Sequence, residues 1–336
     1  MALKLSVIIV NYKSAKLIAG CLDSAFLFPS ANEFEWIIVN NSPDADDESF
    51  ITQKYPFVKW INMGYNSGFA RANNAGIKAA DCDVVLLLNP DTLVLDDAIN
   101  KCYQKFVGRD DAACSVQLLN EDQSPQITGS YFMTGGLNHL LPLPYLGVVL
   151  QWITSPFRKK RTAVIKATVE QQVDRINGAF MMVKKQAIDK AGLFDEDFFL
   201  YSEEVEWCSR LKKAGPIVVY GDLFVVHLQG TSINKETAAA DSSYFDLYDK
   251  KGLQLIISRN MRIRKQFGVG WFVFHLFANT IEIPVYFICS FFQHLFTLKN
   301  PFADFKKIKG YSYNVMRLWG LAPTIIANKP HFYKMF

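Results

Sequence analysis

The sequence predicts an α/β fold with a doubly wound sheet, followed by a helical extension. Continuous apolar runs, such as residues 84–88, are typical of parallel strands covered on both faces, and helical segments alternate with them. The chain beyond residue 250 instead combines aromatic residues with basic charge. With 336 residues, half of them hydrophobic, the chain can bury a large core. We therefore expect an α/β domain at residues 1–250 and an apolar, basic tail at 251–336.

The elements follow from hydrophobic periodicity and from turn residues between the apolar runs. The expected strands are residues 6–10, 36–39, 58–62, 83–88, 173–183, 217–220 and 223–227. The expected helices are residues 14–28, residues 69–80 and one that begins near Glu204. The segment 137–153 is apolar but contains Pro142 and Pro144, and we expect it to be too irregular for a core helix.

Charge is distributed unevenly along the chain. Residues 251–336 hold twelve Lys and Arg against two acids, a net charge of +10, so the first 250 residues carry −6 of the total of +4. Between Lys265 and Lys299 the single charge is Glu282, in a stretch rich in Phe, Ile, Leu and Val. Such an apolar stretch does not suit a nucleic-acid groove, and the composition favours contact with an anionic membrane surface.

The cysteines and the first residues indicate the compartment. The six cysteines show no C-x-x-C pairing, which argues against a structural zinc site and a disulfide framework and favours a reduced cytosol. The apolar run of residues 5–10 is too short for the core of a signal peptide, and we interpret it as the first strand.

Two acidic positions are the main candidates for chemistry. Asp91 follows the strand at 83–88, where ligands of open α/β sheets bind, although a helix cap or turn is the alternative. Glu203 and Glu204 follow an aromatic run, where adjacent acids rarely serve packing, and they suggest a catalytic base. The chain has neither G-x-G-x-x-G nor a P-loop after its first strand, which argues against a dehydrogenase or an NTPase.

Three further features are ambiguous by themselves. Tyr12 lies just past the first strand, where it suits either stacking on a base or packing. His227 lies at the end of a strand, where it is either a site residue or a structural imidazole. The run of four basic residues at 158–161 suits a solvated face, a lipid head group or the acceptor.

An ordered set of motifs resembles family 2 glycosyltransferases of the GT-A fold, and within them the rhamnosyltransferase-like enzymes of bacterial O-antigen and capsule synthesis. The resemblance covers about residues 4–265 and rests on Ser6 to Tyr12, Asn40-Asn41-Ser42, Asn66-x-Gly68-Phe69-Ala70-x-x-Asn73-Asn74-x-Gly76, Asn89-Pro90-Asp91-Thr92, Gly178-Ala179, Phe194-Asp195-Glu196-x-Phe198-Phe199 with Glu203-Glu204, and His227-x-x-Gly230-x-Ser232.

This resemblance implies a mixed GT-A sheet, with a Rossmann-like nucleotide-binding half and an acceptor half, and an inverting transfer from a nucleotide-sugar donor assisted by Mg²⁺ or Mn²⁺. Asp91 would bind the metal, His227 would close over the metal or the diphosphate, and Glu204 would act as the base with support from Glu203. The donor-binding positions would be Tyr12, Asn40, Asn66, Gly68, Asn74 and Asn89, although capping and tight packing are alternatives for Asn66 and Asn74.

Two positions depart from the usual family pattern. Asn40 and Glu204 stand where Asp is usual, so base recognition loses a charge-assisted bond and the catalytic carboxylate sits on a longer arm. The resemblance makes dTDP-L-rhamnose the first candidate donor, ahead of UDP-hexoses. An inactive relative, a noncatalytic membrane scaffold that binds a glycan, and a sugar-phosphate nucleotidylyltransferase are the alternatives, although the last needs a Gly-rich loop that this chain lacks.

The tail is expected to attach the protein to a membrane. Glu282 divides its apolar run into residues 266–281 and 283–298, each too short to span a bilayer. Basic flanks then favour aromatic helices in the interface, with a kinked span or a dimer contact as alternatives. We expect a cytoplasmic protein held at the inner face of the plasma membrane, with a glycan or a polyprenyl-diphosphate-linked acceptor.

Overall fold

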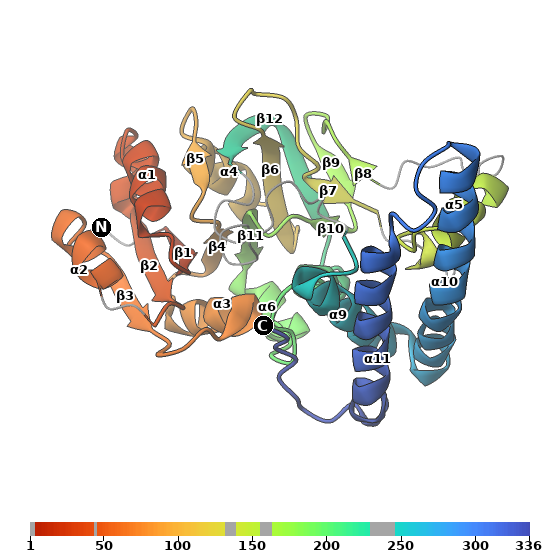
Figure 1. Ribbon diagram of the computed structural model, residues 1–336. Helices are drawn as coiled ribbons and strands as arrows, with labels where there is room; N and C mark the ends of the chain where they lie inside the picture. Colours follow the sequence, from red (N-terminus) through yellow and green to blue (C-terminus); the bar gives the residue numbers. More distant parts are fainter. Residues whose placement is uncertain (1–3, 44–45, 132–138, 155–162, 229–245) are drawn as a thin grey trace. The chain divides into compact units, whose positions relative to one another are not determined.

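The computed structural model describes residues 4–43, 46–131, 139–154, 163–228 and 246–336. These residues form two compact units (Figure 1). Unit 1 comprises Met1–Phe132, Arg161–Phe199 and Glu203–Glu236, and unit 2 comprises Met133–Lys160, Leu200–Ser202 and Thr237–Phe336.

Unit 1 is an α/β unit in which strands and helices alternate along the chain. Its strands are β1 (Leu5–Asn11), β2 (Phe34–Asn40), β3 (Lys59–Asn62), β4 (Val84–Leu88), β5 (Thr92–Val94), β6 (Ala113–Leu119), β7 (Gly129–Ser130), β8 (Ala163–Val164), β9 (Gln171–Val173), β10 (Arg175–Ile176), β11 (Phe180–Lys184) and β12 (Ile217–His227). Its helices are α1 (Ala15–Ala25), the 3₁₀ turn η1 (Pro29–Glu33), α2 (Asp46–Lys54), α3 (Gly68–Ala79), α4 (Ala98–Val107), α6 (Lys185–Ala191) and α7 (Glu203–Leu211).

The main sheet is mixed, which confirms the predicted fold class. Its strands run in the order β3-β2-β1-β4-β11-β6-β12-β5, and β9 pairs with β12 (Figure 1). The half from β3 to β4 is parallel, whereas β11 runs antiparallel to both of its neighbours, β4 and β6. A small second sheet joins β10, β7 and β8.

Burial explains the strand order. Every residue of β4 is buried, because this central strand has partners on both sides and helices over its faces, whereas β3 at the edge has none buried. The core of unit 1 consists of apolar side chains from the sheet and from α1 and α4. The carboxyl ends of β1, β2 and β4 consequently lie at one edge of the sheet, where the predicted site residues follow them.

Three local predictions in unit 1 were wrong. Residues 173–183 do not form one strand but belong to β9, β10 and β11. Residues 217–227 form the single strand β12, which pairs with β6 at residues 217–220 and 224–226, with a register shift between Tyr220 and Phe224. The first helix ends at Ala25 instead of continuing to residue 28, because a 3₁₀ turn that begins with Pro29 follows it.

Unit 2 is helical in the residues that the structure describes. Its helices are α5 (Leu146–Thr154), α9 (Lys250–Phe267), α10 (Val269–Phe296) and α11 (Phe305–Ala327). The apolar segment 137–153 is helical only from Leu146, and several apolar side chains of α5 are exposed, so it is not a core helix. One prediction is corrected here: Glu282 does not divide the tail, because α10 continues through both Glu282 and Pro284.

Glu282 has a structural partner that explains its place inside an apolar helix. Its carboxylate is fully buried and accepts hydrogen bonds from the backbone N–H groups of Tyr145 (2.8 Å) and Leu146 (3.0 Å). These two N–H groups open α5, and helical N–H groups in the first turn have no partner within the helix. Glu282 therefore caps α5 and fixes it to α10.

Helix α10 buries polar residues among apolar ones and exposes a large apolar face. Its buried face contains the polar residues His275, Asn279, Glu282 and Ser290. Its outward face carries large exposed apolar side chains, namely Trp271, Phe274, Phe277, Ile281, Phe287, Ile288 and Phe292. Within the described residues, α10 is the one helix with a length and composition that would allow a membrane span, with 39% of its most apolar stretch buried in the protein.

Candidate active site

Three predicted site residues meet at the carboxyl end of β4. Asp91 and His227 are both buried, and His227 Nε2 lies 3.4 Å from Asp91 Oδ1. Asn89 Nδ2 lies 3.2 Å from the same ring nitrogen. The pairing of β12 with β5 causes this meeting, because it sets His227 opposite Thr92, the residue after Asp91.

Gln126, which the sequence analysis missed, determines how His227 is oriented. Gln126 Nε2 donates to the carbonyl oxygens of His227 (2.6 Å) and Leu119 (3.3 Å), and carbonyl oxygens can only accept. The amide oxygen of Gln126 therefore faces His227 Nδ1, at 3.1 Å, as an acceptor. Nδ1 carries the proton in the neutral ring, so the lone pair on Nε2 points to Asn89 and Asp91.

This corner suits a divalent cation. The Nε2 lone pair, which Asn89 Nδ2 approaches at 3.2 Å, and the Asp91 carboxylate oxygen at 3.4 Å are two electron-pair donors close enough to hold one cation. Two ligands at about 2.1 Å from one Mg²⁺ ion, at a right angle, lie about 3 Å apart. In the described part of the chain, no group of three or more His, Cys, Asp or Glu side chains converges on one point, so a cation at this corner would have two protein ligands of these types, Asp91 and His227.

The predicted base lies at the start of α7. Glu203 is buried as its first residue, and Glu204 follows, half-buried. Among the described residues, the Glu204 carboxylate has no hydrogen bond or ion pair, which leaves it available to a ligand. Tyr201 (φ +69°) and Ser202 (φ +70°) directly precede this turn in the left-handed region, where non-glycine residues are strained and often functional.

The elements that carry Asp91 and Glu204 are linked through one segment of unit 1. Helix α7 packs on β10, and the turn after β10 leads to β11, the antiparallel partner of β4. In that turn, the Ala179 carbonyl accepts a hydrogen bond from the Asn89 backbone N–H at 3.0 Å.

The end of β2 holds an amide network. Asn40 Oδ1 accepts from Asn11 Nδ2 (2.9 Å) and from the Ser42 backbone N–H (3.1 Å), while Asn40 Nδ2 donates to Asn62 Oδ1 (2.9 Å). Asn11 also donates to the carboxylate of Asp47, at 2.8 Å. The structure thus brings a carboxylate close to the position where Asn40 replaces Asp, a neighbour that the sequence analysis missed. The contact of Asn40 and of half-buried Tyr12 with a nucleobase stays a prediction.

The remaining predicted donor residues shape α3 and the loop beside it. Gly68 has φ +77°, and a Cβ atom there would lie 2.3 Å from the Phe199 carbonyl oxygen. Asn74 holds the backbone of Phe194 through two hydrogen bonds of 3.0 Å, and Asn66 Oδ1 accepts from the Gly68 backbone N–H at 3.1 Å. These contacts support the capping and packing alternatives, and a direct role in donor binding stays a prediction.

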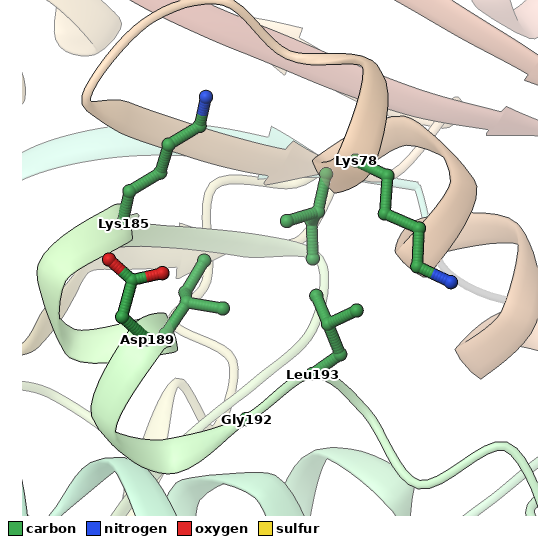
Figure 2. Close-up of a pocket in the computed structure, with 7 residues that line it drawn as sticks. Lys78, Lys185, Asp189, Gly192 and Leu193 are labelled. Atoms are coloured by element: carbon green, nitrogen blue, oxygen red, sulfur yellow. The ribbon is translucent and has the colours of Figure 1, made fainter.

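A surface pocket of about 500 Å³ lies elsewhere in unit 1, beside α3 and α6 (Figure 2). Its lysines already have partners: Lys78 pairs with Glu196 at 3.6 Å, and Lys185 Nζ donates to the Ala80 carbonyl oxygen. None of the predicted site residues lines it. The basic run 158–161 and the positions Gly230 and Ser232 of the His227 motif lie outside the described residues.

The fold is that of GT-A glycosyltransferases. A crystal structure of GalNAc-T7 with UDP, GalNAc and Mn²⁺ matches with a TM-score of 0.51 and 13% identity, over 79% of this chain and 50% of that chain. The family model of glycosyl transferase family 2 matches residues 6–189, more than half of the chain. The chain therefore belongs to glycosyl transferase family 2.

Two characterised relatives are similar at low identity. The low-salt glycan biosynthesis hexosyltransferase Agl10 of Haloferax volcanii is 26% identical over 218 residues, which cover 62% of this chain and 62% of the relative. The N-acetylglucosaminyl-diphospho-decaprenol L-rhamnosyltransferase of Mycobacterium tuberculosis is 25% identical over 216 residues, 60% of this chain and 68% of the relative. The match thus spans less than two thirds of the first relative.

Proposed function

We propose that this protein is an inverting glycosyltransferase of glycan or polysaccharide synthesis that uses a nucleotide-sugar donor. The observation that carries the proposal is the Asp91–His227 corner at the carboxyl end of β4, in a chain of this family that also presents an available carboxylate, Glu204. The relatives named for hexosyl and L-rhamnosyl transfer support the class of reaction. L-rhamnose from dTDP-L-rhamnose is the first donor to test, with UDP-hexoses next.

The chemistry divides between the two carboxylates. Asp91 and His227 would hold Mg²⁺ or Mn²⁺, which supplies positive charge to neutralise a diphosphate leaving group. Glu204 would accept the proton of the acceptor hydroxyl on the other side of the anomeric carbon, and buried Glu203 would fix the first turn of α7. Attack from the side opposite the leaving group inverts the anomeric configuration.

The acceptor is proposed to be a glycan on a polyprenyl diphosphate at the cytoplasmic face of the membrane. The exposed apolar face of α10 supports peripheral attachment, because a helix that carries aromatic residues on its outer face is stable in contact with lipid. Helix α5, which Glu282 caps, adds Val148, Val149, Trp152 and Ile153 to the exposed apolar surface of unit 2.

Nucleoside diphosphate release tests the reaction. The full chain is incubated with a panel of nucleotide sugars and Mn²⁺ or Mg²⁺, with and without lipid-linked acceptors. Asp91→Ala and Glu204→Gln should each abolish transfer, and Glu204→Gln should keep donor binding in calorimetry, because its carboxylate serves the acceptor. Exposed Glu121→Gln is the matched control and should keep full activity.

The same assay separates the proposal from its main alternative. A noncatalytic scaffold would release no nucleoside diphosphate from any donor but would still bind glycans. Unchanged turnover in Glu204→Gln would remove this residue from the role of base. Flotation of the full chain with anionic vesicles tests the membrane part: Trp152→Ser combined with Phe277→Ser should reduce the floated fraction severalfold.

A further inference from the structure

Unit 2 contains a buried group of basic side chains, which we call the basic cluster. It consists of His139, Arg259 and Arg262 of α9, and His275 of α10. Each is 9% exposed or less. Burial of an arginine is costly, and proteins normally compensate for it with a carboxylate or a bound anion.

The members of the basic cluster lie close together. Arg262 Nη2 is 3.2 Å from His139 Nδ1, and the rings of His139 and His275 are 5.8 Å apart. Burial, together with Arg262, His275 and Arg259, lowers the pKa of His139 to about 3. Burial also lowers the pKa of Arg259. Two guanidinium groups and two imidazole rings therefore lie close together in the interior of unit 2.

No carboxylate in the described part of unit 2 is bonded to Arg259 or to His139. The four acids there bond elsewhere: Asp246 to Tyr248, Asp249 to the Gly252 backbone, Glu282 to the start of α5, and Asp304 to Ser290, His294 and Lys307. Within the same residues, the Arg259 side chain has no hydrogen bond or ion pair, and the buried His139 Nε2 has no hydrogen-bond partner.

The surroundings indicate which anion fits. Arginine binds phosphate oxygens through two parallel N–H donors. Half-exposed aromatic residues border the cluster: the Phe267 ring lies 5.3 Å from His139, and the Trp271 ring lies 6.3 Å from His275. Trp271 also belongs to the outward apolar face of α10. A ligand that joins a phosphate to a hydrocarbon chain would therefore match the basic cluster with its phosphate and the apolar face with its chain.

We infer that the basic cluster binds a phosphate group carried by a membrane lipid. The inference rests on the proposed function, from which the diphosphate of a polyprenyl-linked acceptor follows as the source. The head group of an anionic phospholipid has the same chemistry. Arg259 supplies the charge, and His139 supplies a ring nitrogen that a bound phosphate would pair with.

Thermal unfolding of the full chain tests the inference without donor and without turnover. The ligands are farnesyl diphosphate, inorganic diphosphate, and vesicles of phosphatidylcholine with or without phosphatidylglycerol. The variants are Arg259→Met, Arg259→Lys and the control Arg317→Met, which removes the same charge from an exposed position of α11. Farnesyl diphosphate should raise the Tm of the wild type and of Arg317→Met by several degrees.

Arg259→Met should lose this shift, and Arg259→Lys should keep part of it. Without ligand, the Tm of Arg259→Met should equal or exceed that of the wild type, because an uncompensated buried charge is removed. A lower ligand-free Tm would overturn the inference, since it would identify a structural arginine with a counter-charge outside the described residues. An unchanged shift in Arg259→Met would also overturn it.

The ligands separate the sources of phosphate. A shift with farnesyl diphosphate alone supports the acceptor, and a shift with phosphatidylglycerol vesicles alone supports a phospholipid and overturns the acceptor. A response to inorganic diphosphate alone overturns the lipid part of the inference. Because no sugar is transferred in this assay, its outcome is independent of whether the nucleotide-sugar screen succeeds.

Discussion

The amide oxygen of Gln126 lies 3.1 Å from Nδ1 of His227, a residue 101 positions away in the sequence. This contact places the proton of the neutral ring on Nδ1 and leaves Nε2 facing Asp91. Metal-binding histidines commonly depend on such a partner for their orientation. Gln126 is therefore a positioning residue for the proposed metal site.

Gln126→Leu should weaken Mn²⁺ binding by about ten- to a hundredfold, the usual effect of losing the partner of a ligating histidine. Titration of free Mn²⁺ by electron paramagnetic resonance, with UDP present, measures this directly. Gln104→Leu, on the exposed face of α4, is the control and should bind as the wild type does. A folded Gln126→Leu protein with unchanged Mn²⁺ affinity would contradict the role.

Gly68→Ala should destabilise the protein by more than about 2 kcal/mol, because alanine disfavours positive φ and the added Cβ would meet a backbone oxygen. The clash is with the Phe199 carbonyl, 2.3 Å away at φ +77°. Urea denaturation measures the loss. Gly20→Ala in α1 is the matched control: no atom lies within 4 Å of its Cβ position, so a gain of about 0.5–1 kcal/mol is expected. Equal effects of both substitutions would refute the close approach.

Glu282→Ala should destabilise unit 2 by about 1–3 kcal/mol, because two partly buried N–H groups at the start of α5 lose their acceptor. Glu282→Gln keeps one amide oxygen and should cost less. Urea unfolding, followed by the fluorescence of Trp152 in α5, reports on this helix. If Glu282→Ala were as stable as the wild type, the cap would not contribute to stability.

The stability of the protein should fall in acid partly because of His139. Its pKa in the folded state is about 3, against an ordinary value of 6.5, since burial and the neighbours Arg262, His275 and Arg259 disfavour its charge. Above pH 6.5 the contribution is fully present. As the pH falls from 6.5 toward 3, the unfolded chain takes up a proton that the folded chain does not, so stability is lost at up to about 1.4 kcal/mol per pH unit.

Urea midpoints between pH 7.5 and 4.5 measure this dependence. His139→Gln should have a shallower slope than the wild type over this interval, because it cannot take up the proton. His331→Gln, exposed near the C-terminus, should retain the slope of the wild type. Parallel curves for His139→Gln and the wild type would show that His139 does not titrate as its burial implies.

The sequence by itself determined the α/β alternation, the order of the motifs and the positions of Asp91 and Glu204, because apolar periodicity and strand-end polar residues are local properties. Only the tertiary structure decided the rest. Gln126 and His227 meet through strand pairing, and Glu282 remains inside one helix because α5 supplies its partners from residues 145 and 146. No local pattern encodes such contacts, since their energy comes from groups distant in the chain that folding brings together.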